Sequence, residues 1–292
     1  MRQNDYCGLG AGYLSLENFT KFIDLNPQVT EINLAHMGEA FLNPQLKEIL
    51  QLAHQRGITG NFWDVNFNQV SDEVLEALVT CGTRHIKISI DGASQKAYAW
   101  YRRGGDLSAV VTNIKKLNEY KQKHESMFPV LHWQYIILQS TDSETEIKLA
   151  KQMTKELGME PDILFVKDHA GYVPKDLEMI ERETGLSYSD ETWNSDNQSR
   201  YLRCFDLWRS PRINWDGRFL GCCGSSDSQE YPFNCFEMSL KEIYKQDLVV
   251  NTRTMLMGGA EILESPCYWC NVFQVLRSQK NFITADELAK NM

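Results

Sequence analysis

The sequence has no run of about 18 apolar residues, the length that a membrane-spanning helix requires. It also lacks a positive surplus: 30 Lys and Arg against 39 Asp and Glu give a net charge of −9, which argues against a surface that wraps nucleic acid. The first seven residues, MRQNDYC, are polar and lack the apolar stretch of a secretion signal. These absences predict a cytoplasmic protein with no membrane or nucleic-acid partner, whose cysteines act as thiolates.

The chain is long enough for one large and one small domain, with 292 residues of which 42% are hydrophobic and 24% charged. Apolar alternation predicts strands around Ile32 and Leu34 and at 58–67, 85–90, 131–138 and 162–168. Helical spacing predicts helices over 16–25, after Pro44, after Ser71, through Val110 and Leu117, and over 145–157. Strand and helix in regular alternation indicate an α/β fold with a parallel sheet.

Polar residues follow the predicted strands, where folds of this class place their chemistry. The residues found at these strand ends are Gly38, Glu39, Trp63, Asp64, Ser89, Asp91, Gln139, Asp168 and His169. Glu39, Ser89 and Asp91 are polar groups that could converge on one ligand. Taken one at a time, each is more simply explained as a residue that caps a strand end or forms a turn.

Cysteines are concentrated after residue 203, at Cys204, Cys222, Cys223, Cys235, Cys267 and Cys270. Cys267 and Cys270 form a Cys-x-x-Cys turn, which places two thiolates where one metal centre can take both. Between Cys204 and Cys222, Asp216-Gly217 predicts a hairpin with a type I′ turn that returns the chain toward Cys204. Thiolates of this kind suit zinc or an iron–sulfur cluster, and spacing alone does not choose between them. The alternative is a set of buried, reduced cysteines.

In this order, the motifs resemble radical S-adenosylmethionine (SAM) enzymes that carry a SPASM or twitch-type auxiliary-cluster domain. Gly38-Glu39 resembles the Gly-Glu-Pro motif that binds the amino group of SAM, with Ala40 in place of the proline. SIDGAS at 89–94 and the following YRRGGDLSAVVTNI resemble the family's ribose-binding segment. The stretch CFDLWRSPRINWDGRFLGCC resembles the signature of the auxiliary domain.

The resemblance implies a role for each matched position. Ser89 and Asp91 would contact the ribose, and Arg102 the methionyl carboxylate, with Arg103 as the rival candidate. The auxiliary 4Fe-4S ligands would be Cys204, Cys222, Cys267 and Cys270, since the Gly-x4-Cys spacing favours Cys222 over Cys223. The implied fold is a partial (β/α)6 barrel over 1–170, a connecting segment over 171–200, the cluster domain over 201–275 and a helical tail over 276–292.

The implied activity is hydrogen abstraction by a 5′-deoxyadenosyl radical from a peptide or small-molecule substrate. The auxiliary cluster would accept an electron or bind substrate, and an active enzyme would need an electron donor such as flavodoxin or ferredoxin. The protein would position the reactants and exclude water and oxygen.

The chain departs from the family pattern in two places. It has no Cys-x3-Cys-x2-Cys motif, with Cys7 alone near the corresponding position, and no counterpart of the first barrel strand. One hypothesis is that Met1 is an internal residue of a longer frame; another is a non-catalytic relative that binds only the auxiliary cluster or zinc. The second departure is Phe62-Trp63-Asp64, where the family has a small Asn-Gly turn; these bulky residues would narrow the site or belong to the core.

Overall fold

The computed structural model describes residues 9–35, 38–164, 174–186, 204–222 and 231–291. They form two compact units. Described residues from 29 to 186 form the first, which we call the sheet unit; residues 9–28 and those after 203 form the second, the cysteine unit. The sequence placed residues 1–170 in one domain, whereas the structure groups 9–28 with the C-terminal part of the chain.

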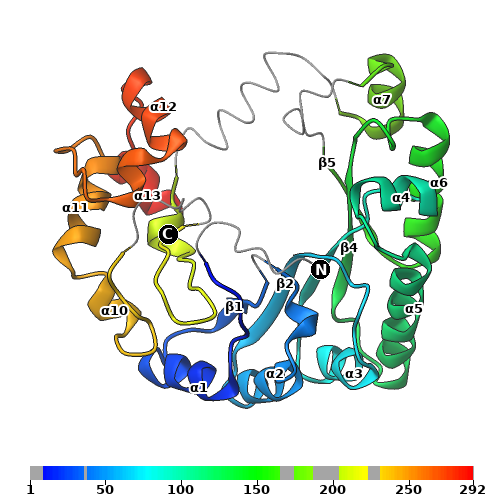
Figure 1. Ribbon diagram of the computed structural model, residues 1–292, viewed down its shortest axis with the longest axis horizontal. Helices are drawn as coiled ribbons and strands as arrows, with labels where there is room; N and C mark the ends of the chain where they lie inside the picture. The colour runs from blue at the N-terminus through cyan, green and yellow to red at the C-terminus, as the bar shows by residue number, and fades with distance from the viewer. Residues whose placement is uncertain (1–8, 36–37, 165–173, 187–203, 223–230, 292) are drawn as a thin grey trace. The chain divides into compact units, whose positions relative to one another are not determined.

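The sheet unit is built on five parallel strands in the order β1-β2-β3-β4-β5. This confirms the predicted α/β class with a parallel sheet, and it is consistent with a partial barrel. The strands are β1 (Glu31–Asn33), β2 (Thr59–Val65), β3 (His85–Ser89), β4 (Val130–Ile136) and β5 (Glu160–Leu164). Strands that neighbour each other in the sheet also follow each other along the chain, so each crossover carries helix between two paired strands (Figure 1).

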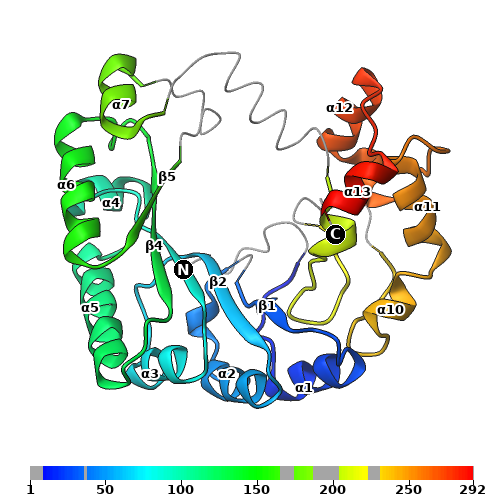
Figure 2. The same ribbon diagram turned by 180° about the vertical axis from the view of Figure 1, so that it is seen from behind.

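The long helices of the sheet unit lie along one face of the sheet, as both views show (Figure 2). The helical segments are η2 (Ala40–Leu42), α2 (Leu46–Gln55), α3 (Asp72–Thr80), α4 (Gln95–Tyr101), α5 (Leu107–Lys123), α6 (Glu144–Glu156) and α7 (Leu177–Thr184). Apolar side chains from the helices and from alternate strand positions, including Phe62, Ile86 and Leu131, form one buried cluster. Burial of this apolar surface holds helices and sheet together.

Local signals set the helix starts. Ser71, Ser94 and Ser143 are N-caps whose side chains accept a backbone N–H of the first turn, and Asp106 does the same for α5. The sequence did not predict α4, a helix of 7 residues that Ser94 begins. In the part of the chain that the structure describes, no helix has the length and apolar character needed to cross a membrane.

The cysteine unit contains short helices from both ends of the chain. They are α1 (Leu16–Leu25), α9 (Asp206–Arg209), α10 (Leu240–Ile243), α11 (Asp247–Leu256), η3 (Pro266–Trp269), α12 (Asn271–Gln279) and α13 (Ala285–Asn291). The predicted bounds of α1 are confirmed, and Ser15 is its N-cap. Asn26 joins the two chain segments, because its buried side chain accepts the backbone N–H of Leu240 at 2.8 Å.

The glycine-rich segment before α1 packs against Trp215. The indole N–H of Trp215 donates to the carbonyl of Leu9 at 3.2 Å, and the side-chain amide of Asn214 donates to the same carbonyl at 2.9 Å. A Cβ at Gly12 would lie 2.4 Å from the indole ring. Glycine is therefore required here for the close approach to the ring.

The hairpin predicted at Asp216-Gly217 is present, but its turn is not type I′. Ile213 and Phe219 form an antiparallel bridge, and the N–H of Gly217 donates to Asn214 at 3.0 Å. A type I′ turn needs positive φ at both central residues, whereas only Gly217 has one, at 90°. Asp216 instead uses its side chain, which accepts the N–H of Arg218 at 3.2 Å and stabilises a tight turn followed by a left-handed glycine.

We expect Gly92→Ala to destabilise the sheet unit strongly. Gly92 has φ 149°, and a Cβ there would lie 2.3 Å from the backbone nitrogen of Tyr98 in α4. Because the contact is with backbone, the expected loss in free energy of unfolding is about 3 kcal/mol. Gly104→Ala is the control, since Gly104 has φ 78° but nothing within 4 Å of an added Cβ; its expected cost is about 1 kcal/mol. Urea unfolding measures both, and equal losses would contradict the steric argument.

Candidate functional site

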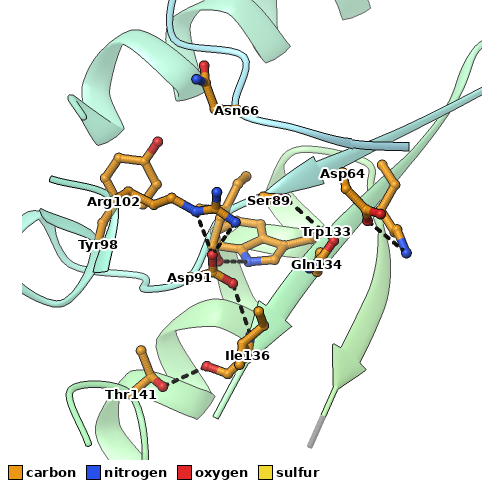
Figure 3. A network of polar contacts seen from close by, with 12 residues as sticks. Asp64, Asn66, Ser89, Asp91, Tyr98, Arg102, Trp133, Gln134, Ile136 and Thr141 are labelled. Atoms are coloured by element: carbon orange, nitrogen blue, oxygen red, sulfur yellow. Dashed lines mark hydrogen bonds and ion pairs between the residues drawn. The ribbon is translucent and has the colours of Figure 1, made fainter. Parts of the chain in front are cut away.

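A buried carboxylate lies at the C-terminal end of β3. Asp91 is 0% exposed, and its Oδ2 accepts from Arg102 Nε at 2.7 Å and lies 2.6 Å from Arg102 Nη2. Its Oδ1 accepts the backbone N–H of Ile136 at 3.2 Å (Figure 3). The carboxylate thus links the end of β3 to β4 and to the residue that follows α4. A buried charge of this kind is stable only because a cation and hydrogen-bond donors surround it.

Glu39 reaches the same edge of the sheet unit from the turn after β1. Its carboxylate accepts the backbone N–H of Asn66 at 2.8 Å and that of Phe41 at 3.4 Å. Burial raises the pKa of Glu39, and the two N–H donors and the charge of Arg102 oppose that rise. Arg102 is therefore close enough to interact electrostatically with Glu39 as well as Asp91. Of the predicted cofactor residues, the structure pairs Asp91 with Arg102 and places Glu39 beside the residue that follows the neighbouring strand β2.

Ser89 is more enclosed than a ligand-binding hydroxyl would be. It is 1% exposed, and its Oγ donates to Gln134 Oε1 at 3.4 Å across β3 and β4. Gly38, in contrast, is exposed, has φ 90°, and has no atom within 4 Å of an added Cβ. Its backbone is thus open to close approach by a ligand. Arg103, the rival of Arg102, is exposed to solvent.

Sequence reasoning missed Tyr98 of α4. Its ring is fully buried, and its hydroxyl accepts from Asn68 Nδ2 at 2.7 Å. Burial raises the pKa of Tyr98, with smaller effects from the charges of Arg102, Asp91 and Glu39. The N-cap Ser94, four residues earlier, was the available signal for the helix that places Tyr98 beside these charges.

Three of the predicted cluster ligands lie near one another in the cysteine unit. The pKa of Cys204 is raised to about 12, chiefly by burial, with smaller contributions from the charges of Asp206, Cys267 and Cys270, while the backbone N–H of Asp206 opposes the rise. Burial also raises the pKa of Cys267 to about 11. The hydroxyl of Tyr231 lies 3.8 Å from Cys267 Sγ.

The cysteines that the structure describes do not form a group of metal ligands. Within the described residues, no three His, Cys, Asp or Glu side chains are grouped so that they could hold a metal ion. Cys222 is half-buried. Cys223, Asp168 and His169 lie outside the described residues. The donor chemistry fits a cluster, but the observed geometry does not gather the four proposed ligands.

We expect Arg102→Met to destabilise the protein more than Asp91→Asn. The first change leaves a carboxylate that is 0% exposed without its cation, with an expected loss of about 3 kcal/mol. The second leaves a guanidinium whose side chain is 28% exposed and can turn to solvent, so about 1–2 kcal/mol is expected. Arg103→Met is the control, with a change within about 0.5 kcal/mol. Free energies of unfolding in urea decide the order, and a larger loss for Asp91→Asn would contradict this account.

Residues 10–136 match the family model of the Radical SAM superfamily. The match runs from the segment before α1 to the end of β4, so it includes Glu39, Asp91 and Arg102 and leaves out the cysteines after residue 203. No curated protein matches the chain. The family match supports an enzyme of the radical SAM type, with an iron–sulfur cluster and SAM as the cofactors that such a domain implies.

Proposed function

We propose that the edge of the sheet unit formed by Gly38, Glu39, Asp91 and Arg102 binds SAM, and that the protein acts on a peptide or small molecule. The observation that carries this proposal is the placement of two charged side chains at the ends of neighbouring strands: Glu39 accepts the N–H of Asn66 after β2, and Arg102 pairs with Asp91 after β3. SAM has a zwitterionic methionyl end, an ammonium beside a carboxylate. An acceptor carboxylate and a guanidinium complement those two groups.

The chain's own residues would divide the binding as follows. Glu39 would accept the ammonium, and Arg102 would donate to the methionyl carboxylate. Gly38, which has no side chain, would allow the ligand close to the backbone. The chemistry that SAM supplies in such enzymes is hydrogen abstraction by a 5′-deoxyadenosyl radical.

Asp91 has two possible roles in this proposal. The resemblance assigns it, with Ser89, to the ribose, but both side chains are buried and both have partners in the structure. The contacts of Asp91 with Arg102 at 2.6 and 2.7 Å support a role in orienting the guanidinium. Asp91 is then a positioning residue for the methionyl carboxylate, since it acts through Arg102.

The auxiliary 4Fe-4S cluster on Cys204, Cys222, Cys267 and Cys270 remains a proposal from the sequence. Its support is the spacing of the cysteines and the proximity of three of them. Among the described residues the thiols of Cys204, Cys222, Cys267 and Cys270 are not gathered around one point, so the cluster has no assigned part in the reaction. A cytoplasmic location and a flavodoxin or ferredoxin as electron donor belong to the same proposal.

We expect wild-type protein to bind SAM and also 5′-methylthioadenosine, which has the adenosyl part but no amino-acid end. Asp91→Asn should weaken SAM binding by about tenfold, the value of one charge-assisted contact, and leave 5′-methylthioadenosine binding nearly unchanged. Isothermal titration calorimetry measures both affinities. Equal weakening of both ligands would assign Asp91 to the ribose instead, and a wild-type protein that does not bind SAM would refute the proposed function.

Metal analysis after anaerobic reconstitution tests the cluster. We expect about four iron atoms and four sulfides per chain if only the auxiliary site fills. The variant with both Cys267→Ser and Cys270→Ser should then lose them, whereas Cys81→Ser, which changes a buried cysteine of the sheet unit, should not. Zinc without iron would make the cysteine unit a structural metal domain and would contradict the proposed cluster.

A further inference from the structure

The pairing of β2 with β3 contains an irregularity at Trp63 and Asp64. Phe62 pairs with Ile86 and Val65 with Ile88, so three steps along β2 match two steps along β3. The extra residue is a β-bulge, and Trp63 and Asp64 together oppose Lys87. Bulges re-aim side chains and are frequent beside functional sites.

The bulge turns Asp64 toward the face of the sheet opposite the apolar cluster. Phe62, Val65, Ile86 and Ile88 belong to that cluster, and Lys87 alternates with the two isoleucines. If side chains alternated strictly along β2, Phe62 and Asp64 would point to the cluster side and Trp63 to the opposite side. Instead Asp64 Oδ1 lies 3.0 Å from Lys87 Nζ, on the side opposite the cluster. Asp64 has φ 67°, a left-handed conformation that most residues with a side chain avoid. This backbone conformation places the carboxylate of Asp64 beside Lys87.

The ion pair is unequally exposed. The side chain of Lys87 is 18% exposed and that of Asp64 is 55% exposed. The ammonium of Lys87 also lies 5.7 Å from the centre of the Trp63 ring. The result is a charge-balanced pair beside an indole, with its carboxylate accessible from outside.

Two imidazoles extend this group along β3 and β4. The ring of Trp63 stacks on His85 with centroids 5.6 Å apart and an interplanar angle of 17°. His85 Nδ1 lies 3.1 Å from His132 Nε2, so one ring donates and the other accepts. The array, which we define as Trp63, Asp64, His85, Lys87 and His132, therefore offers donors, acceptors and an aromatic surface in one place.

We propose that this array binds an uncharged, hydroxyl-rich group such as a sugar-like polyol. Asp64 repels an anion and Lys87 repels a cation, so the pair gives neither kind of ion a net advantage. Hydroxyl groups can donate to the carboxylate, accept from the ammonium or an imidazole, and place their C–H faces against the indole. Neutral polyols are thus the ligand class that fits.

The array is near the proposed cofactor edge. Lys87 lies four residues before Asp91 along β3 and the turn that follows it, which separates their Cα atoms by about 13 Å. A group held here would lie on the same strand as the end of the SAM site, in the position of a substrate. That role rests on the proposed function, whereas the binding itself does not.

Saturation-transfer NMR with D-ribose, methyl β-D-glucopyranoside and myo-inositol tests the binding, with methyl phosphate and glycine as charged probes. We expect at least one polyol to bind wild-type protein saturably and neither charged probe to do so. Asp64→Gly should weaken polyol binding at least about tenfold, because the accessible acceptor is lost. Its melting temperature should equal or exceed that of the wild type, since glycine adopts φ 67° without a side-chain clash.

Asp64→Asn is the second variant, because asparagine tolerates the left-handed conformation and removes only the charge. The matched control is Lys116→Met, which breaks the ion pair of Lys116 with Asp72 at 2.7 Å on the helical side of the same unit; it should leave polyol binding unchanged. No saturable polyol binding to the wild type, tighter binding of methyl phosphate or glycine, or full binding by both Asp64 variants would overturn this inference.

Titration of SAM into the same proteins separates the two proposals. The Asp64 variants should keep wild-type affinity for SAM. A wild type that binds SAM but no polyol would refute the polyol site alone. A wild type that binds a polyol but no SAM would refute the proposed function and leave the polyol site standing.

Discussion

The buried ion pair between Asp91 and Arg102 is the interaction on which the candidate site depends. A carboxylate that is 0% exposed can stay ionised only if its lost hydration is replaced. Arg102 supplies the opposite charge and Ile136 a backbone N–H, and these come from different segments of the sheet unit. The pair therefore fixes the turn after β3 relative to β4, and it holds the guanidinium where it also interacts with Glu39.

Backbone conformations that side chains disfavour occur around this edge, among them those of Gly38, Gly92 and Asp64. Gly38 and Gly92 have φ of 90° and 149°, and Asp64 has φ 67°. At Gly92 the reason is steric, because α4 passes too close for a Cβ. At Asp64 no glycine is present, and the strained residue instead contributes a carboxylate. Packing against α4 thus explains the conformation of Gly92, and the ion pair with Lys87 accounts for that of Asp64.

Much of the fold could be predicted because its signals are local. Ser15 and Ser71 cap helices whose starts were predicted. Apolar alternation located the five parallel strands, since a buried strand shows its pattern within a few residues. The type I′ turn at Asp216-Gly217 was wrong, because the side chain of Asp216 stabilises a different turn. Helix α4 was missed because 7 residues give little periodicity.

The sequence by itself determined the α/β class, the positions of most helices and strands, and the polar residues at their ends. Each of these depends on residues that are close together in the sequence, within about one or two helical turns. Tertiary structure alone decided that residues 9–28 pack with the cysteine unit, that Asp91 is buried against Arg102, and that a bulge sets Trp63 and Asp64 opposite Lys87. These features depend on partners that are distant in the sequence. Burial and strand register select those partners, and no local sequence pattern encodes either of them.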